Sequence, residues 1–236
     1  MRFRVGGGLY HDAMPLEIIL VRHGQSEGNR DKMFTGHGTA RLTSLGVRQA
    51  EAAARAILDQ SARATPPGTL PIDEIYASDL PRAVATARPL AHATGLALIE
   101  TPAIRERDVG EFTGLRFEEV QARWPDGWAA MLSRDPEFRP GGGESHRECA
   151  ERVGRFLDEL MARRAHGRVV LYSHGVAINH MMRHVLGLPP SGAPRAFFQI
   201  ENCSLQRVQV LGGGLLRIAA TNDVAHLAGV VDDGAA

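Results

Sequence analysis

Two histidines follow short apolar segments and precede a glycine, in the stretches LVRHG (20–24) and LYSHG (171–175). An apolar run that stops abruptly at polar residues and glycine is typical of a buried strand that leads into a loop. In a sheet of mainly parallel strands, ligands bind outside the carboxyl ends of the strands. We therefore expect His23 and His174 to lie together at one edge of such a sheet.

Charged side chains near the predicted strand ends add to these histidines. Arg22 precedes His23, Arg82 follows a second predicted strand, and Glu106 follows a third. Arg22 and Arg82 could bind the oxygens of a phosphate dianion through charge-assisted hydrogen bonds. A neutral imidazole attacks phosphorus without a metal, so His23 would become a phosphohistidine. His174 would stabilise charge on the phosphoryl oxygens, and Glu106 would protonate the leaving alkoxide.

Some assignments in this set have alternatives. Asp108 and Glu111 are acids close to Glu106 in the sequence and could replace it as the proton donor. The two glycines after the histidines, Gly24 and Gly175, would let the backbone approach a ligand closely. The predicted helix after Gly175 would also present its N-terminus to an anion. A single histidine taken alone is more often a packed core residue than a nucleophile.

Predicted strands and helices alternate along the chain, which favours an α/β fold with a mainly parallel sheet. The predicted strands span residues 16–21, 72–77, 96–99 and 168–172, and a hairpin spans 204–210 and 215–220. The predicted helices span residues 43–60, 80–94, 144–164 and 175–186, with short helices and loops over 110–143. No repeat or linker is visible, so we expect a loose extension over 1–15 and one catalytic domain over 16–236.

Other residues that could carry chemistry favour a structural interpretation. His180 and His184 have the spacing of a helical metal pair, but no third ligand is evident. Trp124 and Trp128 could form a lid, although ordinary packing is the simpler explanation. Cys149 lies on the apolar face of a predicted helix, which indicates a core position.

The composition excludes several classes of partner. The chain has 27 basic and 27 acidic residues, so a general attraction to nucleic acid or to a membrane surface is not expected. No apolar run approaches the roughly 18 residues that span a bilayer. Gly6, Gly7 and Gly8 stand where a signal peptide needs an apolar core. Two distant cysteines predict neither a disulfide framework nor a cysteine metal site, which fits a cytoplasmic location.

Seven stretches resemble, in order, the histidine phosphatase superfamily, in its cofactor-dependent phosphoglycerate mutase-like branch. They are LVRHGQSEGN (20–29), FTG (34–36), LTSLGVRQA (42–50), SDLPRAVATA (78–87), RERDVGEFTG (105–114), GGES (142–145) and SHG (173–175). Together they cover nearly the whole chain from residue 16. An isolated R-H-G is a weak signal, but the ordered set is highly specific.

The resemblance implies a three-layer α/β/α fold with a six-stranded, mostly parallel mixed sheet. It places the phosphorylated histidine on His23 and the acid/base on Glu106. It places the phosphate pocket on Arg22, Arg82 and His174, with Asn29, Thr35, Gly36 and Gly175 lining it. It implies no metal and no cofactor.

Departures from the family pattern bear on the substrate rather than on the reaction type. Gly28 stands where many relatives have Trp, and Phe112-Thr113 replaces the more usual Trp-Glu. Residues 37–41 lack an Asp that is often present. The mutases carry a longer, basic stretch after the acid, whereas residues 115–140 are short and partly acidic. These differences favour a hydrolase.

We therefore expect a metal-independent phosphatase that hydrolyses small phosphomonoesters through a phosphohistidine on His23. A phosphoglycerate mutase is the alternative, and a non-catalytic phospho-ligand-binding member is a third. The expected partner is a small phosphorylated substrate, without nucleic acid or membrane. The oligomeric state stays open, with a homodimer as one option.

Overall fold

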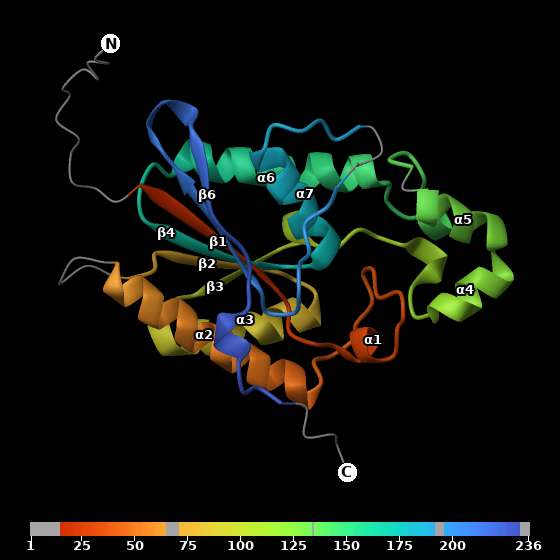
Figure 1. The fold of residues 1–236 in the computed structure, drawn as a ribbon, viewed down its shortest axis with the longest axis horizontal. Helices are drawn as coiled ribbons and strands as arrows, with labels where there is room; N and C mark the ends of the chain where they lie inside the picture. Colours follow the sequence, from red (N-terminus) through yellow and green to blue (C-terminus); the bar gives the residue numbers. More distant parts are fainter. Residues whose placement is uncertain (1–14, 65–70, 134, 192–195, 232–236) are drawn as a thin grey trace.

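The structure is a computed structural model that describes residues 15–64, 71–133, 135–191 and 196–231 (Figure 1). The extension predicted over 1–15 lies outside this range, apart from its last residue. The strands are β1 (Leu16–Arg22), β2 (Glu74–Ser78), β3 (Leu98–Thr101), β4 (Arg168–Ser173), β5 (Leu205–Val210) and β6 (Leu216–Asp223). The helices are α1 (Glu27–Arg30), α2 (Ser44–Arg63), α3 (Pro81–Thr94), α4 (Phe117–Arg123), α5 (Pro125–Ser133), α6 (His146–Arg163) and α7 (Gly175–Val185).

The strands form one six-stranded mixed sheet in the order β3-β2-β4-β1-β5-β6. Strands β1 to β4 are parallel to their neighbours among themselves, and β5 is antiparallel to both β1 and β6. This confirms the predicted mostly parallel sheet and the C-terminal hairpin. In the central pair, Arg22 of β1 lies opposite Ser173 of β4, so the two strands end together. This register brings the residues after both strands to one edge of the sheet.

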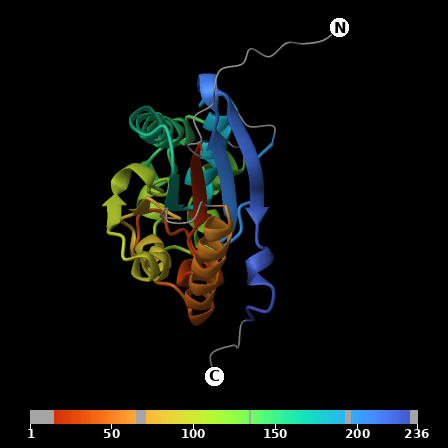
Figure 2. The ribbon, with the colours of Figure 1, turned by 90° about the vertical axis from the view of Figure 1, so that its left-hand side faces the viewer.

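Helices cover both faces of the sheet, with α6 and α7 on one face and α2 and α3 on the other (Figures 1 and 2). Alternate residues of β1 point to opposite faces, as a strand requires. Leu16, Ile18 and Leu20 pack in the core beneath α6 and α7. Ile19 and Val21 pack in the core beneath α2 and α3. Because both faces of β1 are buried, its sequence is a continuous apolar run.

Local capping signals define most helix ends. Thr43 caps α2 as predicted, and its side chain accepts a hydrogen bond from Gly46. Helix α3 starts at Pro81 and ends at Thr94, and the next residue, Gly95, caps it with a φ of 71°. The predicted boundaries of β2 and β3 were wrong by two residues at their starts. Apolar residues precede both strands, but pairing between β2 and β3 starts only at Ile75 and Leu98.

Helices α4 and α5 lie beyond the carboxyl ends of the central strands (Figure 1). Trp124, between the two helices, and Trp128 of α5 pack in a separate aromatic cluster with Phe34, Phe112 and Phe117. This confirms ordinary packing for both tryptophans. Among the described helices, none is long and apolar enough to cross a bilayer.

Gly24 and Gly46 lie against each other where the loop after β1 meets the start of α2. A Cβ atom on Gly24 would stand 2.4 Å from the carbonyl oxygen of Gly46. A Cβ atom on Gly46 would stand 2.0 Å from the carbonyl oxygen of Gln25. Gly24 therefore permits close contact with α2, and that it also lets the backbone approach a ligand stays a prediction. The close contact fixes the loop that carries His23.

We predict that Gly46→Ala lowers the free energy of unfolding by about 1–3 kcal/mol, because backbone atoms must move to relieve the overlap. Alanine favours a helix over glycine by about 1 kcal/mol, so the steric cost must exceed that gain. Urea denaturation measures the change. Gly212→Ala is the matched control, since no atom lies within 4 Å of its added Cβ. A Gly46→Ala protein as stable as the wild type would contradict the steric account.

Candidate active site

His23 is buried directly after β1, with 3% of its surface exposed. Its Nδ1 atom lies 2.8 Å from the carbonyl oxygen of Gly24. Because a carbonyl oxygen only accepts hydrogen bonds, Nδ1 must carry the ring proton in the neutral imidazole. The lone pair is then on Nε2, which accepts a hydrogen bond of 3.3 Å from the Nε atom of Arg82. The backbone thus selects the tautomer in which Nε2 is the nucleophilic nitrogen.

Arg82 is fully buried in the first turn of α3. Its guanidinium donates to the carbonyl oxygens of Gly36 at 2.8 Å and of Gly38 at 3.0 Å. Burial is the main cause that lowers the pKa of Arg82, to about 10, so it is charged at neutral pH. In the described part of the chain, Arg82 has no carboxylate within ion-pair distance. A buried charge of this kind is suited to an anionic ligand.

Arg22, the last residue of β1, supplies a second buried guanidinium. Its Nη1 atom donates to the carbonyl oxygen of Ile200 at 2.6 Å, while its Nε atom is buried without a hydrogen-bond partner. Burial lowers the pKa of Arg22, and nearby Glu106 opposes that shift. A Cβ atom on Gly175 would stand 3.5 Å from the Arg22 Nε atom, so the start of α7 borders this arginine.

His174 follows β4 and faces His23, with 5.1 Å between the ring centroids. Its Nε2 atom lies 2.8 Å from the hydroxyl oxygen of Ser78, at the end of β2. That hydroxyl already accepts from the Leu80 backbone N–H, so its own proton can be donated to His174. His174 would then carry its proton on Nδ1, which is buried without a partner. Sequence reasoning did not select Ser78 as the residue that orients His174.

Both histidines are neutral in this environment. Burial lowers the pKa of His23 and of His174 well below the usual value. The positive charges of Arg82 and Arg22 lower both further. Two uncharged imidazoles therefore lie beside two buried guanidiniums, and the unprotonated Nε2 of His23 faces Arg82.

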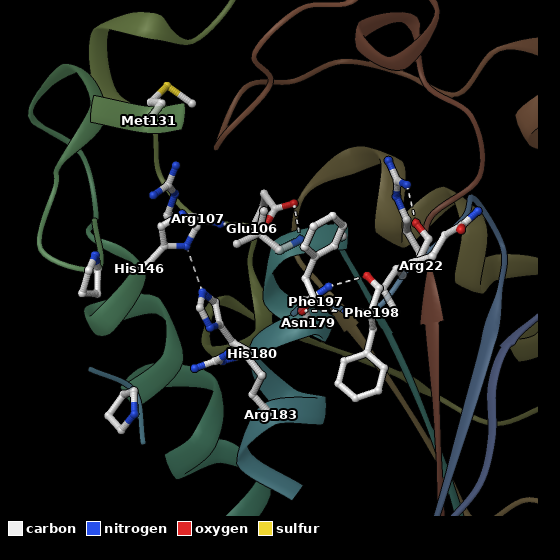
Figure 3. A pocket seen from close by; sticks show the side chains of 16 residues that line it. Arg22, Glu106, Arg107, Met131, His146, Asn179, His180, Arg183, Phe197 and Phe198 are labelled. Carbon is white, nitrogen blue, oxygen red and sulfur yellow. Dashed lines mark hydrogen bonds between the residues drawn. The ribbon is translucent and has the colours of Figure 1, made fainter. Parts of the chain in front are cut away.

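Glu106 lines a pocket next to Arg22 and Gly175, whereas Asp108 and Glu111 do not line it (Figure 3). The Glu106 carboxylate accepts backbone hydrogen bonds from Val176 at 3.2 Å and from Ala177 at 3.1 Å. We expected the N-terminus of α7 to receive a ligand anion, but these two donors bind Glu106 instead. Of these three acids, Glu106 alone lines the pocket, and its role in proton transfer stays a prediction.

The carbonyl oxygen of Glu106 is also held in place. It lies 2.9 Å from the Nε2 atom of His37, and it accepts from Arg152 at 3.3 Å. Arg152 additionally donates to the carbonyl oxygens of Ala103 and Arg105. The segment that carries Glu106 is thereby attached to α6 and to the loop after α1.

Asn29 of α1 and Thr35 in the loop after α1 make no hydrogen bond to His23 or Arg82. The Oδ1 atom of Asn29 accepts from Asn202 at 3.2 Å, and Asn202 also donates to the carbonyl oxygen of His23 at 2.8 Å. The Thr35 methyl group fills the space that a Cβ on Gly28 would need, 2.0 Å away. That Asn29 and Thr35 line a phosphate site stays a prediction. No motif had drawn attention to Asn202.

His180 and His184 contact different side chains, which agrees with two packed histidines rather than a metal-binding pair. His180 lies 3.1 Å from His146, and His184 lies 2.8 Å from Asp158. Within the residues that the structure describes, no three His, Cys, Asp or Glu side chains gather as metal ligands. Cys149 is buried in the core beneath α6 and α7, as predicted.

The sequence pattern of the histidine phosphatase superfamily (branch 1) matches residues 18–224. The chain belongs to this superfamily. Its relatives include a probable phosphoglycerate mutase GpmB of Proteus mirabilis, which is 32% identical over 92% of this chain and 98% of that protein. The family binds small phosphorylated substrates, and the geometry described above fits such ligands.

Solved structures extend the comparison. A mycobacterial glucosyl-3-phosphoglycerate phosphatase in complex with VO3 has a TM-score of 0.72 and 28% identity, over 87% of this chain and 98% of that chain. YhfR of Bacillus stearothermophilus has a TM-score of 0.77 and 20% identity, over 90% of this chain and 99% of that one. Because the identity to YhfR is only 20%, this similarity shows the fold alone. The superfamily is established, and the comparisons include both mutases and phosphatases.

We predict that the imidazole NMR signals of His23 and His174 do not titrate between about pH 7.5 and 6, a range in which an ordinary histidine takes up a proton. Arg82→Met removes a positive charge next to both rings, so it should raise both pKa values. Arg88→Met, an exposed arginine on α3, is the control and should change neither. Rings that titrate near pH 6.5 in the wild type would contradict this electrostatic description.

Proposed function

We propose that this protein is a metal-independent phosphatase that hydrolyses small phosphomonoesters through a phosphohistidine on His23. The observation that carries the proposal is the Nε2 lone pair of a neutral histidine beside the buried guanidinium of Arg82. Arg22 and Arg82 would bind the phosphoryl oxygens. The buried Nδ1–H of His174 would donate to another of these oxygens.

The reaction proceeds in two proton-balanced steps. In the first, His23 Nε2 attacks phosphorus, the ester P–O bond breaks, and protonated Glu106 gives its proton to the leaving oxygen. In the second, ionised Glu106 takes a proton from water while the water oxygen attacks phosphorus and the P–N bond breaks. Inorganic phosphate leaves, and both His23 and Glu106 return to their starting forms. The carbonyl of Gly24 holds the ring through its Nδ1–H during both steps.

Phosphatase and mutase chemistry share the first step and differ in the acceptor. Hydrolysis is supported by the short segment over α4 and α5, which contains Glu118, Glu119 and Asp126 rather than a basic run. It is also supported by the 28% identity to a phosphatase of similar length. The Proteus mirabilis relative favours the mutase alternative.

We predict that the protein releases phosphate from 4-nitrophenyl phosphate in the presence of EDTA. His23→Ala should lower kcat by about a thousandfold or more, because no other group replaces the nucleophile. His92→Ala, an exposed histidine on α3, is the matched control and should keep the wild-type rate. Turnover by His23→Ala within tenfold of the wild type, or full loss of activity in EDTA, would rule out the mechanism.

A second assay distinguishes water, the acceptor in a phosphatase, from a phosphoglycerate hydroxyl group, the acceptor in a mutase. We expect phosphate release from 3-phosphoglycerate to exceed its isomerisation, both with and without a bisphosphoglycerate primer. Isomerisation that outpaces hydrolysis would establish the mutase. Binding of inorganic phosphate without turnover of any phosphomonoester would instead indicate a non-catalytic phosphate-binding protein.

A further inference from the structure

The carbonyl group of Gly24 contacts the ring of His23 on the side away from Arg82. Its oxygen lies 2.8 Å from Nδ1 of His23, whereas Arg82 contacts the opposite ring nitrogen, Nε2. In the reaction proposed above, Nε2 bonds to phosphorus and can then no longer accept from Arg82. The bond from Nδ1–H to Gly24 must then hold the ring in its plane. The direction of the Gly24 carbonyl therefore bears on the reaction itself.

That carbonyl shares a planar peptide unit with the N–H of Gln25. In a trans peptide the C=O and N–H groups point in opposite directions, so a contact that fixes one also fixes the other. The Gln25 N–H donates to the side chain of Gln49 at 2.8 Å. Because a backbone N–H only donates, Gln49 faces it with its oxygen atom, Oε1. Gln49 thus sets the direction in which the Gly24 carbonyl points.

Gln49 reaches this peptide from α2. It lies three residues after Gly46, which packs against Gly24, and residues three apart on a helix share a face. At the start of the same helix, the Thr43 N–H donates to the carbonyl oxygen of Gln25 at 2.9 Å. One face of α2 therefore fixes the backbone of Gln25 at both its N–H and its C=O group.

The preceding peptide, between His23 and Gly24, is held from two other segments. The Gly24 N–H donates to the hydroxyl oxygen of Thr86, a buried residue of α3, at 3.0 Å. Asn202, which precedes β5, donates to the carbonyl oxygen of His23 at 2.8 Å. Glycine permits a wide range of backbone torsions, so the next peptide could still rotate about Gly24. The contact at the Gln25 N–H opposes that rotation.

We propose that Gln49 is a positioning residue for the nucleophile and acts through the Gly24–Gln25 peptide. This rests on the proposed function, in which Nε2 of His23 attacks phosphorus. Hydrogen bonds run from Nδ1–H of His23 to the Gly24 carbonyl, and from the Gln25 N–H to Gln49. Because hydrogen bonds in a chain polarise one another, this peptide is a stronger acceptor for the ring. The ring becomes positively charged as Nε2 bonds to phosphorus, and the chain stabilises that charge.

The test compares Gln49→Met, which has a similar length but no strong acceptor, with Gln49→Glu, which keeps an acceptor oxygen. Pre-steady-state release of 4-nitrophenolate from 4-nitrophenyl phosphate measures the first step. We expect Gln49→Met to lower its saturating rate by about threefold to tenfold, as for one lost hydrogen bond. The half-saturating substrate concentration should stay unchanged, because Gln49 acts on the ring and not on the phosphate. Gln49→Glu should keep at least the wild-type rate, and so should Gln121→Met, an exposed control on α4.

A second measurement requires no turnover. The proton NMR signal of Nδ1–H in His23, identified by its loss in His23→Ala, moves to lower field and exchanges more slowly as its hydrogen bond strengthens. Gln49→Met should move this signal to higher field and speed its exchange with solvent, whereas Gln49→Glu should not. Gln49→Asn has an amide that is one carbon too short to reach Gln25. It should behave like Gln49→Met and replaces that variant if it does not fold.

The two measurements together separate the positioning role from the proposed function. A wild-type Nδ1–H signal in Gln49→Met and Gln49→Asn would overturn the positioning role, and so would a slower first step with an unchanged signal. A higher half-saturating concentration at an unchanged saturating rate would also overturn it, because that result indicates phosphate binding. A shifted signal in a protein that hydrolyses no phosphomonoester would support the role of Gln49 at the ring and contradict the proposed function alone.

Discussion

The buried guanidinium of Arg82 is the interaction on which the rest of the site depends. It carries a positive charge in the interior and is held by two backbone carbonyls, those of Gly36 and Gly38, rather than by a carboxylate. These carbonyls orient the side chain without cancelling its charge, so the charge remains available to an anion. Burial, reinforced by this charge, lowers the pKa of His23 and of His174, which preserves the lone pair that a nucleophile needs.

The sheet brings these groups together through its register. Because β1 and β4 are neighbours that end at Arg22 and Ser173, the residues that follow them meet at one edge. Two hydrophobic cores, one on each face, hold the central strands in that register. Shifting one strand by a single residue would turn its apolar side chains to the wrong faces, so core packing and site geometry are specified together.

Helix α7 has a different role from the one expected of a helix N-terminus beside an anion site. The N–H groups of Val176 and Ala177 in its first turn bind the carboxylate of Glu106, which lies between Arg22 and Arg107 (Figure 3). One of these two sides, with Arg22 and Arg82, matches a phosphoryl group. The other contains Arg107, which lines a pocket together with Arg22 and Glu106.

Many features of this protein follow from short stretches of its sequence. The apolar runs, the N-cap Thr43, the proline Pro81 in the first turn of α3, and the ordered motifs determine the element types, the sheet class and the superfamily. They also single out His23, His174, Arg82 and Glu106, because strand ends can be read from neighbouring residues. Only the tertiary structure decided which ring nitrogen of His23 is unprotonated, that Ser78 contacts His174, and that Asn202 holds the His23 backbone. Each of these depends on where hydrogen-bonding or charged groups from different segments lie, and that placement exists only once the sheet register and the loop packing are set.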